Sequence, residues 1–193
     1  DIRYMTDFKN MFYNDYIITK FDSWDSYQLF LNNDTIKDIE NWDTSNIRSM
    51  QNMFWHSQDH PDLNNLDLSN WKVDNVTNMN LCFWNYNNFT GKGLENWNVI
   101  HVKYEYSRKP EERQPKISGM LNMFSGTQFN NPDIKCWKFH PTIIRYITEH
   151  YSQGIPRKSE RLIYYLGIKD AVNNTPLGED ETNLEVVLKC WDG

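Results

Sequence analysis

A short frame recurs six times along this chain of 193 residues: an apolar residue, two further residues, and tryptophan. Six of the eight tryptophans fall into it, which chance would not produce for so rare a residue. Such self-similarity is the signature of a repeat architecture. The frame, which we call the tryptophan frame, ends at Trp24, Trp42, Trp71, Trp97, Trp137 and Trp191.

A second motif follows the tryptophan frame at a fixed offset. Apolar residues stand five, eight, eleven and twelve positions after both Trp42 and Trp71, and these two copies lie 29 residues apart. In a helix this spacing places four side chains in one stripe, so each copy predicts a short amphipathic helix. Thr44-Ser45-Asn46 and Val73-Asp74-Asn75 precede the copies and offer oxygens for N-caps. The four copies of the motif begin at Met5, Ile47, Val76 and Ile117.

Each repeated unit combines such a helix with a short strand that ends at the tryptophan. One unit has an apolar helix face and an apolar strand face, which is too little to fold alone, so neighbouring units must stack. We therefore predict an α/β fold: a leucine-rich-repeat-like solenoid with short parallel strands and short helices, over residues 1–140. A charged, proline-containing insertion interrupts it at residues 103–116.

The units resemble the leucine-rich-repeat variants of BspA-like surface proteins and of the DUF285 repeats. Those repeats run close to "tryptophan, Asp, small, Ser, Asn, Val or Ile, two more, Met, two more, Met-Phe". Residues 42–54 are a near-complete instance, and residues 71–83 are a second, with Lys72 and Cys82 as departures. The resemblance covers about residues 1–139. It implies a protein partner and an extracellular or cell-surface location, with a virion or the cytoplasm as alternatives.

The sequence changes character at residue 141. Helical spacing of apolar residues after Pro141 predicts a helix that ends before Gly154, and a second helix is predicted over Ser159–Leu166. Residues Leu184–Leu188 predict a strand that leads into the last tryptophan frame. We therefore expect a more helical C-terminal region over 141–193, which is either a cap or an insertion and ends in a final strand.

Charge and hydropathy exclude two kinds of partner. The net charge of −6 and the pI near 5.3 argue against nucleic acid, because the phosphate backbone needs a concentrated basic face. No apolar run approaches the roughly 20 residues that a membrane span requires, so we expect no direct membrane insertion. The chain begins without Met inside a helix motif, as expected of a piece of a longer array.

No arrangement of residues predicts catalysis, a cofactor or a metal. His56 and His60 have a spacing that suits a metal on a helix, but a proline follows at once and favours a turn. Gly91-Lys92-Gly93 lacks the upstream glycine and the Ser or Thr of a phosphate loop. Three cysteines cannot form a closed set of disulfides, and a bridge between Cys136 and Cys190 is a minor alternative.

A row of side chains on the predicted strands offers a contact surface. Strand side chains alternate, so the second residue of each frame faces outward and the third, as in Asn41, Asn70 and Asn96, forms an inward asparagine ladder. Strict alternation would expose the tryptophans as an aromatic stripe, whereas a bend would bury them; we favour burial because the stripe would be a large apolar patch. The partner-binding candidates from this row and the insertion are Asp22, Glu40, Ser69, Glu95, Lys135, Arg108, Lys109 and Arg113.

These observations favour a non-enzymatic protein-protein interaction module from a surface or adhesion-type protein. Its strand face and charged insertion would contact another protein. The alternative is a structural or cement subunit of a large assembly such as a virion. An enzyme that uses residues 141–183 has only scattered residues in its favour, such as His140, His150 and Glu149.

Overall fold

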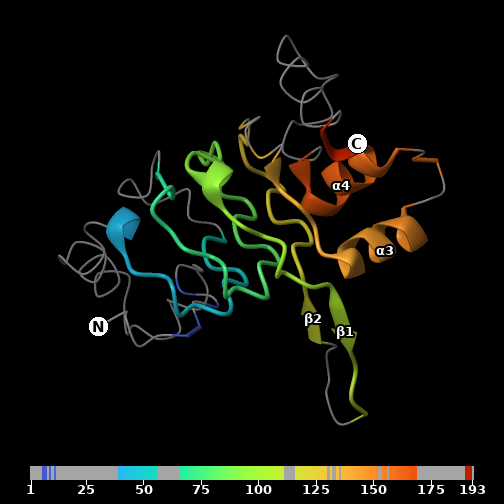
Figure 1. The fold of residues 1–193 in the computed structure, drawn as a ribbon, viewed down its shortest axis with the longest axis horizontal. Coiled ribbons are helices and arrows are strands. Elements are labelled where there is room, and N and C mark those ends of the chain that lie inside the picture. Colours follow the sequence, from blue (N-terminus) through green and yellow to red (C-terminus); the bar gives the residue numbers. More distant parts are fainter. Residues whose placement is uncertain are drawn as a thin grey trace.

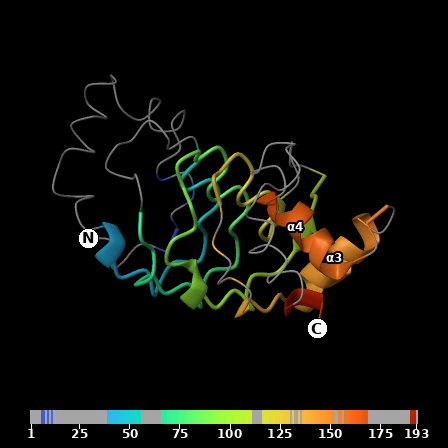
Figure 2. The same cartoon turned by 90° about the horizontal axis from the view of Figure 1, so that it is seen from above.

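The computed structural model shows the repeated units as turns that lie side by side (Figures 1 and 2). Two helices, α3 (Pro141–His150) and α4 (Lys158–Leu166), lie at one end, and a hairpin of β1 (Glu105–Ser107) and β2 (Lys116–Ser118) projects from the turns (Figure 1). The residues described are 6, 7, 9, 11, 39–55, 66–110, 116–129, 131, 134, 136–151, 154, 155, 157–168 and 190–192. The tryptophan frame at Trp24 and the predicted strand at 184–188 lie outside them.

The predicted solenoid of parallel strands and short helices is wrong. In the described part of the chain the one sheet is the β1–β2 hairpin, which is antiparallel. Parallel pairing there is limited to isolated bridges, from Asp7 to Ser49 and from Ser49 to Asn78. The segments 47–54 and 76–83, predicted as helices, consist of such a bridge followed by turns.

The tryptophan frame is a tight turn and not a strand. The tryptophan N–H donates to the carbonyl three residues earlier, from Trp42 to Ile39 at 3.2 Å and from Trp97 to Leu94 at 3.1 Å. Both turns are short 3₁₀ helices, η2 (Ile39–Asn41) and η5 (Leu94–Asn96). Three residues complete one 3₁₀ turn, so the apolar residue and the tryptophan lie on the same side.

This geometry decides which frame residues are buried. The favoured burial of the tryptophans is confirmed for Trp71, Trp97, Trp137 and Trp191, while Trp42 is half-buried. The inward asparagine ladder is wrong. Asn70 Nδ2 does donate to Asn41 Oδ1 at 3.3 Å, but both side chains are on the exposed side, because the third residue of a 3₁₀ turn points away from the first.

At Trp71, Trp97 and Trp137 the buried indole also joins two units. Its N–H donates to the carbonyl that begins the frame of the preceding unit, which satisfies the buried indole without water. These bonds run from Trp71 to Ile39 at 2.9 Å, from Trp97 to Leu68 at 3.1 Å, and from Trp137 to Leu94 at 2.9 Å. One residue type therefore closes a turn through its backbone and holds the next turn through its side chain.

Left-handed backbone positions prevent the predicted helices. Asn52, Leu81 and Asn122 have φ of 56°, 56° and 52°, and each stands two residues after the first methionine of its motif. A left-handed residue interrupts the right-handed helix, so its N–H groups bond to the next unit instead. Such bonds run from Met50 to Asn78 at 2.8 Å and from Asn52 to Asn80 at 3.0 Å.

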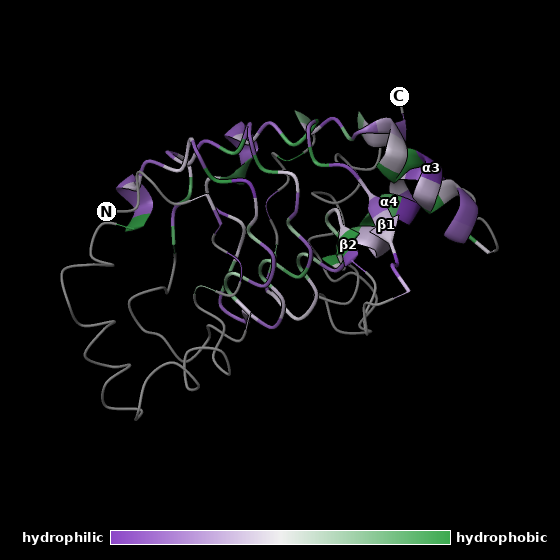
Figure 3. Cartoon of the chain, turned by 90° about the horizontal axis from the view of Figure 1, so that it is seen from below, coloured by the Kyte–Doolittle hydropathy of each residue, from purple (hydrophilic) through white to green (hydrophobic). Residues whose placement is uncertain are grey.

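A column of phenylalanine rings fills the core between the turns. Phe54, Phe83 and Phe124 hold the same position in three units, with ring centroids 5.3 Å and 5.8 Å apart and nearly parallel planes. Phe89 and Phe129 stack on the second and third of these rings, each at 4.1 Å. Figure 3 shows the resulting alternation of apolar and polar stretches along each turn.

The two helices predicted after residue 140 are confirmed as α3 and α4. The end of α4 occupies the place of a further unit: the N–H groups of Asn122 and Phe124 donate to the carbonyls of Tyr165 and Leu166, both at 2.8 Å. The Tyr165 hydroxyl accepts from the Met120 N–H at 2.9 Å. α4 therefore covers the last turn. Cys82 is buried, and Cys136 and Cys190 are free and exposed, so the alternative disulfide is not formed.

We predict that Trp97→Phe lowers the free energy of unfolding by about 2 kcal/mol, because the indole bond and part of a buried ring are lost. Trp191→Phe is the matched control. Trp191 is equally buried, but among the described residues its indole N–H has no acceptor, so only about 1 kcal/mol of packing is lost. Chemical denaturation measures both, and equal losses would show that the indole bond does not stabilise the fold.

We predict that Leu81→Asn raises the free energy of unfolding by about 0.5–1 kcal/mol, because asparagine tolerates the left-handed backbone better than leucine. The reverse exchange at the equivalent position, Asn122→Leu, should lower it by a similar amount. Both are read from denaturant midpoints. A destabilised L81N variant would mean that the packing of the half-buried leucine outweighs its backbone strain.

Candidate functional site

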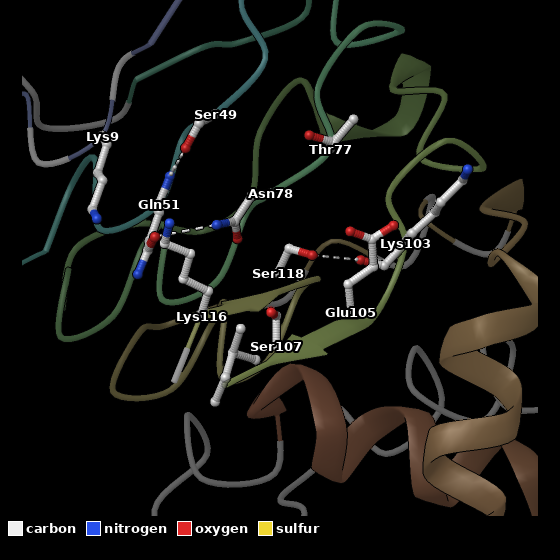
Figure 4. A pocket seen from close by; sticks show the side chains of 11 residues that line it. Lys9, Ser49, Gln51, Thr77, Asn78, Lys103, Glu105, Ser107, Lys116 and Ser118 are labelled. Atoms are coloured by element: carbon white, nitrogen blue, oxygen red, sulfur yellow. Dashed lines mark hydrogen bonds between the residues drawn. The ribbon is translucent and has the colours of Figure 1, made fainter. Parts of the chain in front are cut away.

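A polar groove of about 580 Å³ lies between the stacked turns and the β1–β2 hairpin (Figure 4). Three successive units form one side of the groove, and the hairpin forms the other. Its lining residues are Lys9, Ser49, Gln51, Thr77, Asn78, Lys103, Glu105, Ser107, Lys116, Ile117 and Ser118.

The floor of the groove is polar because its residues alternate with buried methionines. Ser49 and Gln51 flank Met50, and Asn78 precedes Met79; both methionines are fully buried. Where the backbone is locally extended, neighbouring side chains point to opposite sides, so the polar neighbours of each methionine face solvent. The bridge between Ser49 and Asn78 places this polar row side by side in adjacent units.

Hydrogen bonds between units hold the floor in place. The Arg48 N–H donates to Thr6 O and the Thr77 N–H to Arg48 O, both at 2.8 Å. Asn78 Nδ2 donates to Gln51 Oε1 at 3.2 Å, which orients both amide groups. The groove is therefore formed before any ligand arrives.

Three lysines and one glutamate line the groove, which gives it a local charge of +2 on a chain of net charge −6. Lys9, Lys103, Lys116 and Glu105 are all exposed. Within the described residues, no ion pair joins Lys9 or Lys103 to a carboxylate. The charges of these two ammonium groups therefore face solvent and can attract anions.

The hairpin is anchored at its base to α3. The Tyr104 N–H donates to Thr142 Oγ1 at 2.9 Å, and the Tyr104 ring stacks on Tyr146 with centroids 3.8 Å apart. Burial, followed by the neighbouring Tyr146, raises the pKa of Tyr104 to about 12, so its phenol stays protonated at neutral pH. Ser118 Oγ donates to Lys103 O at 3.3 Å and ties the two ends of the hairpin together.

Beyond its base the hairpin is exposed. Tyr106 pairs with Ile117 in the register, and its side chain is 56% exposed. It is the one large apolar side chain with such exposure in the part of the chain that the structure describes. Arg108 and Lys109 follow it and are also exposed. These two predicted contact residues thus follow an exposed aromatic residue closely along the chain.

Two members of the predicted outward row, Glu40 and Glu95, hold neighbouring units together, and a third, Ser69, bonds within its own turn. Glu40 Oε1 accepts from the Asp67 N–H at 2.8 Å, and Glu95 Oε2 accepts from Asn131 Nδ2 at 3.0 Å. Ser69 donates its hydroxyl to Asp67 Oδ1 at 2.5 Å. These three candidates are half-buried and do not lie in the groove. Asp22, Arg113 and Lys135 lie outside the described residues.

Sequence reasoning missed most of the groove. Lys9, Ser49, Thr77 and Asn78 were not singled out, although the position of Ser49 and Asn78 directly beside a methionine was a usable signal. Lys103 lies inside the predicted insertion but was not distinguished from its neighbours. The missing information was that the insertion folds back beside the turns.

The described residues contain neither a metal-binding cluster nor a membrane-spanning helix. His, Cys, Asp and Glu side chains form no group of three or more there that could hold a metal ion. No helix in that part of the chain combines the length and apolarity needed to cross a membrane. His56 and His60, the pair considered for a metal, lie outside the described residues.

Asp67 links two turns through its carboxylate. It accepts from the Ser69 hydroxyl and, at 3.1 Å, from the Ser69 N–H, and it lies 2.9 Å from Lys92 Nζ. The bonds from Ser69, followed by that from Lys92, lower the pKa of Asp67 to about 2 and raise the pKa of Lys92. The ionised form of Asp67 therefore stabilises the folded state.

We predict that Asp67→Asn lowers the free energy of unfolding at pH 7 by about 1 kcal/mol. The folded-state pKa lies below the unfolded value, so this stabilisation is present above about pH 4 and is lost as pH falls towards 2. The free energy of unfolding, measured by denaturation at each pH, should fall more steeply over that pH range for the original chain than for D67N. Parallel declines would assign the acid sensitivity to other carboxylates.

Comparison with known families gives one match. A family model described as "Mycoplasma protein of unknown function, DUF285" matches residues 6–108, which is more than half of the chain and includes the frames at Trp42, Trp71 and Trp97. No curated protein and no solved structure gives a significant match. The match confirms the resemblance to the DUF285 repeats. The chain belongs to the DUF285 family.

Proposed function

We propose that this chain is a non-enzymatic protein-binding module and that the β1–β2 hairpin, together with the adjacent groove, is its contact surface. The likeness of its units to the repeats of BspA-like surface proteins supports an adhesion-type role. Of the two contact surfaces expected from the sequence, the charged insertion is kept, because it forms the hairpin with Arg108 and Lys109, and the strand face is dropped.

The exposed Tyr106 is the observation that carries this proposal. Tyrosine and arginine are enriched among the residues that dominate protein-protein binding energy, because they combine a large contact area with polar groups. Tyr106 and Arg108 stand two residues apart on a hairpin that projects from the turns (Figure 1). An exposed tyrosine of this kind has an apolar ring to bury and a hydroxyl to pair in a complex.

The anchoring of the hairpin supports the same role. Because Tyr104 is bonded and stacked on α3, the base of the hairpin is held before a partner arrives. Preorganisation lowers the entropic cost of binding, because fewer conformations are lost when the partner binds. The outward row is less suited to contact, because Glu40 and Glu95 already accept hydrogen bonds from a neighbouring unit.

We predict that the triple variant Tyr106→Ala, Arg108→Ala and Lys109→Ala recovers a specific partner at least about tenfold less efficiently than the original chain. Affinity capture with the intact chain as bait, followed by quantitative mass spectrometry, makes the comparison. These substitutions are preferable to deletion of 103–116, which would also remove Tyr104 from its place on α3.

The matched control is Lys138→Ala with Arg145→Ala, two exposed cations that lie outside the hairpin. It should capture the partner as well as the original chain does. Circular dichroism and denaturation curves verify that both variants are folded. Equal recovery by the folded hairpin variant would refute the hairpin as the contact surface.

A further inference from the structure

We propose that the groove binds an acidic, extended segment of the partner protein, meaning a stretch of successive Asp or Glu residues. This inference rests on the proposed function and adds the chemistry of the partner. The groove carries its +2 charge on a protein of net charge −6, so its attraction for carboxylates is local. Local complementarity of this kind steers association and selects partners by charge.

The lysines come from separate parts of the chain. Lys9 belongs to one of the stacked turns, whereas Lys103 precedes β1 of the hairpin and Lys116 begins β2 (Figure 4). The fold therefore gathers positive charge that is dispersed in the sequence. Ammonium groups donate to carboxylates in charge-assisted bonds, which are stronger than bonds between neutral groups. A ligand with several carboxylates can engage lysines on both sides of the groove.

The rest of the lining favours a polypeptide over a nucleic acid. Hydroxyls of Ser49 and Ser107 and the amides of Gln51 and Asn78 provide both donors and acceptors. An extended peptide presents both N–H and C=O groups along its length and can use both kinds. A phosphate backbone presents acceptors alone and needs a continuous basic face, which the carboxylate of Glu105 interrupts.

The size and rigidity of the groove fit a short segment. Its volume of about 580 Å³ lies within the range of about 300–1,000 Å³ that is usual for ligand sites. Its floor is held by hydrogen bonds between units, among them the bond from the Thr77 N–H to Arg48 O. The site can therefore receive a few residues without rearranging the turns.

The test measures binding of a fluorescently labelled peptide of about ten glutamates to the intact chain by anisotropy. Saturable binding is expected, and the double variant Lys9→Gln and Lys103→Gln should weaken it about tenfold, because two charge pairs are lost. Raising NaCl from about 50 mM to about 500 mM should weaken binding further, since exposed charges are screened. A glutamine peptide of equal length should bind at least about tenfold more weakly.

The control variant is Lys72→Gln with Lys138→Gln, which removes two exposed lysines that do not line the groove. It changes the net charge of the chain by the same amount and should alter binding less than about twofold. An equal loss in both double variants would overturn the proposal, because the attraction would then be general. Equal binding of the glutamine and glutamate peptides would overturn it as well.

Two further measurements separate the alternatives. If inorganic phosphate or a sulfated polysaccharide competes at lower concentration than the glutamate peptide, the occupant is another anion and the proposal fails. If the glutamate peptide does not bind while the hairpin triple variant still loses its partner, the assignment of the groove fails and the proposed function stands. If the triple variant still captures its partner while peptide binding depends on the groove lysines, the hairpin assignment fails and the assignment of the groove stands.

Discussion

The hydrogen bond from a buried indole N–H to a carbonyl of the preceding unit is the contact on which the stacked turns depend. It is made by Trp71, Trp97 and Trp137, each time to the residue that begins the neighbouring frame. The accepting carbonyl also receives the N–H that closes its own turn. Turn formation and stacking are therefore coupled at one atom, which defines the register between units and aligns the phenylalanine column behind it.

This register explains how the chain accommodates an insertion. Backbone hydrogen bonds between units continue across the insertion, from the Met79 N–H to Gly119 O and from the Phe83 N–H to Met123 O, as they do between the earlier units. The additional residues leave the stack as the β1–β2 hairpin, which is held against α3 by Tyr104. Because the stack keeps its register, the insertion forms a wall beside the turns. The groove is the space between that wall and the polar row.

The sequence allowed part of this to be foreseen. Periodic tryptophans predicted stacked units, and the helix signals after residue 140 predicted both α3 and α4, although α3 ends at His150, well before the predicted stop at Gly154. The helices and strands of the units were not foreseen correctly. A spacing of three residues suits a helical stripe and a series of 3₁₀ turns alike, and the left-handed position at Leu81 carries no local signal, because leucine rarely adopts it.

The repeat, the apolar residues that pack its core and the net negative charge follow from the sequence alone. The tertiary structure decided how the backbone satisfied its hydrogen bonds. N–H groups that an isolated unit would use within a helix found acceptors in the next unit, from Met50 to Asn78 and from Phe54 to Cys82. It also brought Lys9 to the same groove as Lys103, a proximity that no local pattern encodes, because it depends on the stacking of whole units and the folding back of the hairpin.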